Sequence, residues 1–335
     1  MMDSATSESR GGHLPTGLVR DDLYRLHETP PGHPECPRRC DAMATGLAEP
    51  ALAGRLVPIA ARDATLDELL AVHEAGYVRT VRDEVAAGFS GLSTGDTAIG
   101  PHTYAAALRA AGGVCAAVDA VAAGLVANAF CAVRPPGHHA TASRGMGFCV
   151  FNNVAVAARH AQRACGLGRV LIVDWDVHHC NGTQDIFYED PSVLLFSTHQ
   201  WPWYPSSGLA GQTGRGAGDG ATINCPLPAG SGREEILGAM VEKLIPAADA
   251  FRPDIVLISA GFDSRAGDPL GQFRLRDEDF ADMTVLVMDI AHRHARGRLV
   301  SAIEGGYSLE GVSAATAAHV SALAGLAQEK VAGSR

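Results

Sequence analysis

Five short segments that are apolar at consecutive positions constrain the fold of this chain most strongly. Strands that are buried on both faces of a sheet have this pattern, whereas half-exposed strands alternate between apolar and polar residues. Ala-rich amphipathic stretches lie between the segments, so the connections should be helical crossovers and the sheet parallel. We therefore predict an α/β fold with strands over 129–133, 169–174, 193–197, 254–260 and 298–303. Helices are predicted over 104–126, 152–165, 233–249, 278–295 and 310–326.

The length and composition favour one folded domain. The chain has 335 residues, of which 47% are apolar, so it can bury a substantial core and a largely disordered chain is excluded. We expect loose ends over 1–15 and 329–335, where Ser, Gly and charged residues gather. The net charge of −10 argues against a nucleic-acid-binding surface, which normally appears as a basic patch.

The cysteines and the N-terminus indicate a cytoplasmic protein. The eight cysteines form no CxxC pair and several lie in apolar runs, which is typical of reduced, buried thiols. The N-terminus lacks the apolar core of a secretion signal. The longest apolar stretch, around 116–133, is interrupted by Asp119 and Asn128, so we expect no membrane span.

Polar and titratable residues follow every predicted strand. His138 and His139 follow the first strand, Asp176 and His178 the second, and His199 the third. The last two strands lead to the groups Phe262–Asp263 and Glu304–Tyr307. In open parallel sheets, ligands bind in the crevice outside the carboxyl ends of the strands. The sequence therefore predicts a functional site at this edge.

The spacing of three of these residues suggests a metal site. Asp174, Asp176 and His178 are two residues apart, so in an extended segment their side chains share one side. Asp176 and His178 could then bind one cation, with Asp263 as the best third ligand because it follows another strand. One imidazole and two carboxylates suit a catalytic divalent ion better than a structural zinc, which would use thiolates.

The adjacent pair His138 and His139 points to proton transfer beside that metal. Asp174 could accept a hydrogen bond from one imidazole and Asn181 from the other, which would give the two histidines different pKa values. Tyr307 could donate to an oxyanion that develops at the metal. A buried tyrosine that only completes a hydrogen bond is the alternative interpretation of Tyr307.

At this point the motifs resemble a known family. RPPGHHA, GFCVFNN, DWDVHHCNGTQDIFY, GFDSRAGDPLG and EGGYSLEG are similar to segments of the histone deacetylase and acetylpolyamine amidohydrolase family. The similarity runs from about residue 16 to 326, and Asn181 places the chain nearest to the class II-like bacterial branch. The resemblance implies an arginase–deacetylase fold, in which helices flank a central eight-stranded parallel sheet. It implies one histone deacetylase-like catalytic domain over 16–328.

The resemblance also assigns roles to individual residues. Asp176, His178 and Asp263 match the ligands of one zinc ion per chain. His139 matches the general base and acid, and His138 its electrostatic partner. Tyr307 matches the tyrosine that polarises the scissile carbonyl.

The substrate tunnel and two monovalent-cation sites are implied in the same way. The walls of an acyl-lysine tunnel would be formed by Gly147, Phe148, Tyr204 and Leu270. An inner site, usually for potassium and formed largely by backbone carbonyls, would use Asp174, Asp176, His178 and Ser197. An outer site would use Phe187, Asp190 and Val193.

Together these features predict a zinc-dependent amidohydrolase that removes an acetyl or other short acyl group from an N-acyl-lysine or related N-acyl amine. An acetylpolyamine deacetylase is the alternative: Leu270 replaces an acidic residue of polyamine-specific relatives, but Asp96 and the negative net charge would suit a cation. An arginase-like ureohydrolase would need two metal ions, and a non-catalytic acyl-lysine binding module would need no intact site. A homo-oligomer stays open.

Two further positions carry specific expectations. Cys180 stands where the family has Gly, and we expect a buried, unreactive thiol there. Glu35 and Arg38, in a segment resembling the first rim loop, are expected to form a surface ion pair.

Overall fold

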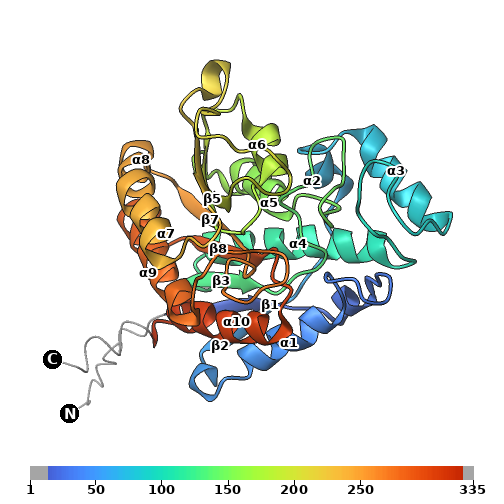
Figure 1. Ribbon diagram of the computed structural model, residues 1–335, viewed down its shortest axis with the longest axis horizontal. Coiled ribbons are helices and arrows are strands. Elements are labelled where there is room, and N and C mark those ends of the chain that lie inside the picture. Colours follow the sequence, from blue (N-terminus) through green and yellow to red (C-terminus); the bar gives the residue numbers. More distant parts are fainter. Residues whose placement is uncertain (1–13, 327–335) are drawn as a thin grey trace, which may run out of the picture.

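Eight parallel strands form one sheet in the order β2-β1-β3-β8-β7-β4-β5-β6, with helices on both sides (Figure 1). This computed structural model describes residues 14–326, and the predicted α/β fold is confirmed. Of the predicted loose ends, 1–13 and 329–335 lie outside the described residues. The strands are β1 Thr16–Val19, β2 Leu56–Ile59, β3 Asn128–Cys131, β4 Val170–Asp174, β5 Val193–Gln200, β6 Thr222–Leu227, β7 Ile255–Ala260 and β8 Leu299–Ile303.

The helices form two layers. One layer contains α4 (Thr103–Ala122), α5 (Asn153–Cys165), α2 (Leu66–Leu70), α3 (Ala75–Ala86) and α6 (Asn181–Phe187), which contact one another in a chain. The other contains α1 (Arg38–Leu47), α10 (Leu309–Leu323), α9 (Asp277–His294) and α8 (Ile245–Phe251), with α7 (Arg233–Ala239) leading into α8. The central strands between them are buried along their whole length, as continuous apolar runs require.

All five strands predicted from the sequence are present, and three others are not among them. The strands β1 and β2 are only four residues long, and β2 is a half-exposed edge strand that contains Pro58. The other edge strand, β6, contains Pro226. Short strands and proline at sheet edges give little apolar signal, which explains why the sequence pattern missed them.

The helix predicted over 233–249 is instead α7, a π-helical turn over Met240–Leu244, and α8. Pro246 occupies the first turn of α8, where its missing N–H is tolerated. The helix predicted over 104–126 ends at Ala122, before Gly124 adopts a φ of +69°.

Helix α4 is long and apolar enough to cross a membrane by length and composition alone. However, 72% of its most apolar 18-residue window is buried inside the protein, where it packs against α5 and strands β1, β3 and β8. A core helix of a globular domain meets the same criterion, so this feature is weak evidence for a membrane span.

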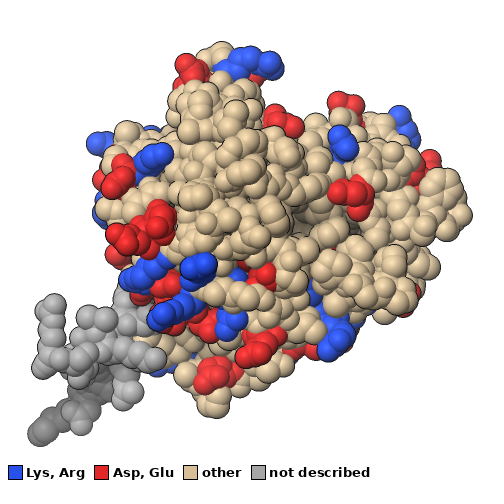
Figure 2. Space-filling model, viewed as in Figure 1, with Lys and Arg blue, Asp and Glu red and all other residues tan. Residues whose placement is uncertain are grey.

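Acidic and basic side chains are interspersed on the face of the molecule shown in Figure 2. Over the part of this face that the structure describes, Lys and Arg form no continuous surface of one sign. That distribution agrees with the acidic balance of the sequence, 37 Asp and Glu against 27 Lys and Arg.

The close approach of α4 to the segment before α2 generates a stability prediction. A Cβ at Gly112 would overlap the backbone of Arg62 and Ala64, whereas a Cβ at Gly238 in α7 would meet nothing within 4 Å. Gly112→Ala should therefore destabilise the fold by about 1–3 kcal/mol, the range for overpacking a core. Gly238→Ala should stabilise it by up to ~1 kcal/mol, the gain in helix propensity. Urea unfolding of both variants measures this, and equal midpoints would contradict the packing.

Candidate active site

Three potential metal ligands meet where β4 and β7 end. Asp176 and His178 follow β4, whose last residue is Asp174, and Asp263 follows β7, the neighbouring strand. His178 Nδ1 lies 3.0 Å from Asp176 Oδ1 and 3.2 Å from Asp263 Oδ2. The ligand atoms of all three residues lie within 4.8 Å of one another, and the three residues are buried. The structure thus brings together the triad proposed from spacing.

The surroundings of this triad fit a divalent cation. The Asp263 Oδ2 atom is buried and accepts no hydrogen bond from a described residue. Burial, together with the neighbouring Asp176 carboxylate, raises the pKa of Asp263 to about 7, because two negative charges are unfavourable so close together. A Cβ at Gly305 would overlap both carboxylates, so the backbone there leaves room only for them. A cation would offset both charges, and one imidazole with two carboxylates suits Zn²⁺.

The tandem histidines lie beside the triad and have different partners. His138 Nδ1 lies 3.1 Å from Asp174 Oδ2, and His139 Nδ1 lies 2.8 Å from Asn181 Oδ1. The two imidazole rings are 4.0 Å apart between centroids. Both partners match the arrangement expected from the sequence.

These partners separate the pKa values of the two histidines. Burial alone would lower the pKa of His138, but the carboxylates of Asp176 and Asp174 raise it to about 10. Burial lowers the pKa of His139 well below its usual value, and the positive charges of His138 and His178 lower it further. Its hydrogen-bond partner, Asn181, is uncharged and does not stabilise an imidazolium as a carboxylate would. At neutral pH, His139 is therefore the neutral ring of the pair and can accept a proton.

Tyr307 lies across the site, on a loop that Asp268 holds. The Oδ2 atom of Asp268 accepts from the backbone N–H groups of Tyr307 and Ser308, at 2.7 and 3.0 Å. Its Oδ1 atom accepts from Leu270 at 2.9 Å, so one carboxylate fixes both its own turn and the tyrosine loop. Arg39 donates to Gly306 O at 2.7 Å, and its guanidinium lies 5.2 Å from the Tyr307 ring centroid.

A narrow cavity of about 230 Å³ leads to these groups. It is lined by Asp96, His139, Gly147, Phe148, His178, Trp203, Tyr204, Leu270 and Tyr307. Phe148 and Tyr307 contact edge to face at 5.8 Å, and Tyr204 and His139 do so at 5.2 Å. All four residues expected in a substrate tunnel are therefore in this lining.

The residues expected at the two monovalent-cation sites are also close together. Asp174 and Ser197 are paired residues of adjacent strands β4 and β5. Phe187, Asp190 and Val193 form the tight turn between α6 and β5, with hydrogen bonds from Asp190 N to Phe187 O and from Val193 N to Asp190 O. These contacts place the groups near one another, and cation binding by them stays a prediction.

Three expectations need comment. Glu35 is completely buried and pairs with Arg39 and Arg134 rather than with Arg38, so the expected surface ion pair is wrong. His199 lies within β5 rather than after it, and its Nε2–H donates to Gly208 O at 2.8 Å in the core. Cys180 is buried, as expected, and burial raises the pKa of its thiol well above the usual value.

Several residues that support the site were not among the sequence candidates. Glu304, directly after β8, accepts from the backbone N–H groups of Gly137 and His138 at 2.7 and 3.1 Å. Its position at a strand end was the available signal. Trp203 lines the cavity and donates to Leu270 O at 2.8 Å, and it stands next to the predicted Tyr204. Arg39 and Asp268 hold the tyrosine loop through contacts between distant segments, which no local pattern encodes.

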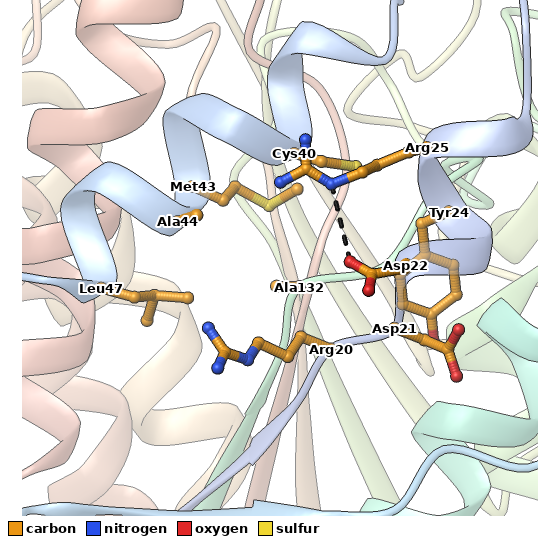
Figure 3. A pocket seen from close by; sticks show the side chains of 10 residues that line it. All are labelled: Arg20, Asp21, Asp22, Tyr24, Arg25, Cys40, Met43, Ala44, Leu47 and Ala132. Carbon is orange, nitrogen blue, oxygen red and sulfur yellow. Dashed lines mark ion pairs between the residues drawn. The ribbon is translucent and has the colours of Figure 1, made fainter.

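A second cavity, of about 500 Å³, lies between α1 and the turn after β1 (Figure 3). Charged residues line one side of it, with an ion pair between Arg25 and Asp22 at 3.7 Å. It shares no lining residue with the narrow cavity, so the two cavities are distinct.

The fold and the convergent side chains define an α/β protein with a cluster of potential metal ligands at the carboxyl ends of its strands, beside a narrow cavity. A comparison with protein families shows which one. The pattern of the histone deacetylase domain matches residues 33–323, so the chain belongs to the histone deacetylase family.

Individual relatives agree with this assignment. The chain is 40% identical over 298 residues to a probable deacetylase of Archaeoglobus fulgidus, covering 88% of this chain and 82% of that protein. It is 42% identical over 279 residues to a histone deacetylase-like amidohydrolase of Pseudomonas aeruginosa, covering 83% and 73%.

Human polyamine deacetylase HDAC10 is 42% identical over 308 residues, which cover 87% of this chain but only 45% of that longer protein. The solved structure of the HDA15 HD domain superposes with a TM-score of 0.88 at 39% identity, covering 93% of this chain and 90% of that one. The fold and family are therefore established together.

The Asp268 contacts lead to a prediction about the tyrosine loop. In Asp268→Asn, one of the two acceptor oxygens becomes an NH₂ donor. The side chain can then no longer accept from all three backbone N–H groups, those of Leu270, Tyr307 and Ser308, so the loop should lose its fixed position. We expect kcat for an N-acetyl substrate to fall about 10–100-fold, the cost of a misplaced reacting group, with little change in KM. Asp282→Asn, at an exposed ion pair with Arg233, is the control. Equal kinetics for the two variants would contradict this role.

Proposed function

We propose that this protein is a zinc-dependent amidohydrolase that removes an acetyl or other short acyl group from an N-acyl-lysine or a related N-acyl amine. One observation carries the proposal: the carboxylates and imidazole of Asp176, His178 and Asp263 meet next to His139 and Tyr307 at a narrow, aromatic-walled cavity. Membership of the histone deacetylase family and the relatives named as deacetylases support it.

The cavity suits a linear acylated chain. Aromatic rings of Phe148, Tyr204 and Trp203 line it, and such surfaces pack against methylene groups. His33 stacks edge to face on Phe148 at 4.7 Å, which supports that ring from behind. A linear chain would place its terminal amide near His139 and Tyr307.

Asp176, His178 and Asp263 would hold the zinc ion, which when bound supplies a Lewis acid that polarises a carbonyl and lowers the pKa of water. The chain's own groups then handle the protons. His139 donates its Nδ1–H to Asn181 Oδ1, which leaves Nε2 to accept a proton from the attacking water. The same nitrogen returns that proton to the leaving amine.

Tyr307 and His138 would complete this chemistry. Burial raises the pKa of Tyr307 well above its usual value, so the phenol stays protonated and can donate to an oxyanion. One such donor is worth about 3 kcal/mol in comparable enzymes. His138, paired with Asp174, would contribute positive charge beside the general base.

Replacing the general base tests this function directly. His139→Asn should lower kcat for a fluorogenic acetyl-lysine peptide by at least about 100-fold, because no nearby group replaces its proton transfer. Metal analysis of the same preparation should still find the catalytic zinc, since His139 is not one of the proposed ligands. Near-normal turnover would overturn the proposed role, and loss of zinc would show that His139 acts through the metal instead. His292→Asn, at an exposed position of α9, is the matched control.

Deacetylation of a polyamine is the second candidate, and Asp96 favours it. Its carboxylate lines the cavity, accepts from Gly147 N at 2.7 Å and lies 3.4 Å from Tyr204 Oη, with no basic side chain bonded to it among the described residues. A free carboxylate there could attract the distal ammonium of a polyamine. Leu270, also in the lining, offers no second charge, so we favour an acyl-lysine substrate.

A substrate panel separates the two candidates. We expect kcat/KM for acetyl-lysine peptides to exceed that for acetylputrescine and acetylspermidine by at least about tenfold, because an exposed carboxylate alone adds ~1 kcal/mol or less. If the polyamines are preferred and Asp96→Asn removes that preference while peptide turnover persists, the polyamine assignment holds instead. Arginine in the same panel, with urea as the product, tests the ureohydrolase alternative.

A further inference from the structure

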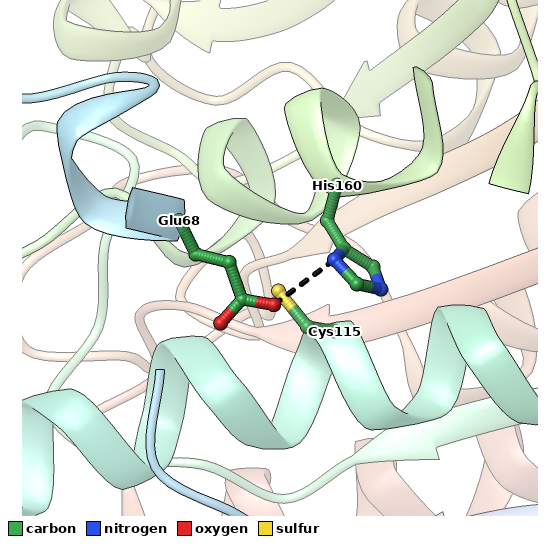
Figure 4. Close-up of side chains that lie close together, drawn as sticks. All are labelled: Glu68, Cys115 and His160. Atoms are coloured by element: carbon green, nitrogen blue, oxygen red, sulfur yellow. Dashed lines mark ion pairs between the residues drawn. The ribbon is translucent and has the colours of Figure 1, made fainter. Parts of the chain in front are cut away.

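A second group of metal-type ligands lies between α2, α4 and α5, away from the narrow cavity. Figure 4 shows Glu68, Cys115 and His160 pointing toward one another from these three helices. Two more potential ligands lie on the other side of the His160 ring. They are Asp119, one turn beyond Cys115 in α4, and Cys165, the last residue of α5. None of these residues lines the active-site cavity.

Both nitrogens of His160 face carboxylate oxygens. Nδ1 lies 3.0 Å from Glu68 Oε1, and Nε2 lies 2.6 Å from Asp119 Oδ1. Glu68 is itself fixed, because Arg62 donates to both of its oxygens at 2.6 and 2.8 Å. Glu68 is therefore a firm acceptor that holds a proton on Nδ1. An unprotonated Nε2 and the Asp119 carboxylate oxygen would repel each other at 2.6 Å. The contact therefore requires either a second proton on the imidazole or a cation between the two atoms.

A sulfur ligand lies at the same place. Cys165 Sγ is 3.7 Å from Asp119 Oδ1, and the ligand atoms of Asp119, His160 and Cys165 all lie within 4.8 Å of one another. For a tetrahedral ion with bonds of about 2.0–2.3 Å, ligand atoms are about 3.3–3.7 Å apart. The Asp119 side chain is 49% exposed, so it can move outward from His160 to reach that spacing and leave a position for water.

The charges around this group suit a divalent ion. Glu68, Asp119 and a Cys165 thiolate would contribute three negative charges, and Arg62, whose Nη2 lies 3.8 Å from Asp119 Oδ2, one positive charge. The remaining two negative charges match one divalent cation. Cys115 lies on the Nδ1 side of the ring, grouped with Glu68, so it is not among the ligands proposed on the Nε2 side.

We propose that Asp119, His160 and Cys165 bind a soft divalent cation of the Zn²⁺ class, with Glu68 orienting His160 from behind. The ion would join the last turn of α4 to the end of α5. Nitrogen, oxygen and thiolate ligands with one open position are a set that zinc accepts, and cobalt and cadmium substitute for it. The alternative is a doubly protonated His160 between two carboxylates.

Cobalt substitution, in which bound metal is first removed with a chelator and cobalt is then added back, distinguishes these states. The proposed catalytic ligands include no thiolate, so a thiolate-to-cobalt absorption band in the near ultraviolet can arise only from a cysteine site. We expect the band to saturate within two added equivalents per chain, one for each site, and to disappear in Cys165→Ser and in His160→Gln. Cys36→Ser, outside the cluster, should keep it. Excess Zn²⁺ should abolish the band by competition.

Two results would overturn the proposal. Absence of the band at a tenfold excess of cobalt over protein would assign His160 as an imidazolium in an ion-pair network. A band that survives Cys165→Ser but disappears in Cys115→Ser would place the ion on the inner side of the ring. The test does not depend on the deacetylase assignment, because its readout is absorption. Retained deacetylase activity in Cys165→Ser would show that any second ion is not catalytic.

Discussion

The structure depends on burying one imidazole 3.0 and 3.2 Å from two carboxylates at the ends of β4 and β7. Transfer of an isolated carboxylate from water into the protein interior is costly, and removing one partner of a buried pair typically costs about 3–5 kcal/mol. Strand order makes the arrangement possible, because β4 and β7 are neighbours and their ends leave the sheet together. A bound cation would convert this repulsive cluster into a stable one.

Hydrogen bonds connect the loops around that cluster. Asp176 Oδ2 accepts from Gly305 N at 2.8 Å, and Asp263 Oδ1 accepts from Val177 N at 2.9 Å. Glu304, at the start of the tyrosine loop, accepts from the turn that carries His138. The two proposed carboxylate ligands therefore also position neighbouring loops. Substitution of one such residue should disturb both metal binding and the geometry of the proton-transfer groups. The effects of separate substitutions in this cluster are therefore not expected to be additive.

The sequence predicted the parts of this site that follow from strand position. Long apolar strands are recognisable, and residues such as Asp176, Asp263 and Tyr307 directly follow them, so their convergence could be inferred from a parallel sheet. The partners of the tandem histidines, Asp174 and Asn181, were also expected, but supporting contacts between distant segments were not. Arg39 reaches Gly306 across 267 residues, and Glu35 pairs with Arg134 across 99, although the sequence suggested a surface pair. Such partners depend on three-dimensional packing, and the edge strands β2 and β6 were missed because proline weakens their pattern.

Specificity in this cavity must come from two different parts of it. Apolar walls such as Phe148 and Tyr204 distinguish chains poorly, since one methylene group changes binding by only about 1–3 kcal/mol. Under the proposed function, they would therefore select a linear aliphatic chain rather than a particular amine. Discrimination between amines falls to polar groups in the lining that a substrate can satisfy or leave unpaired. Asp96 is such a group, because its carboxylate bonds only to Gly147 and Tyr204 among the described residues. A neutral peptide N–H and a polyamine ammonium could both donate a hydrogen bond to this carboxylate. Only the positive charge of the ammonium would then distinguish the two kinds of substrate.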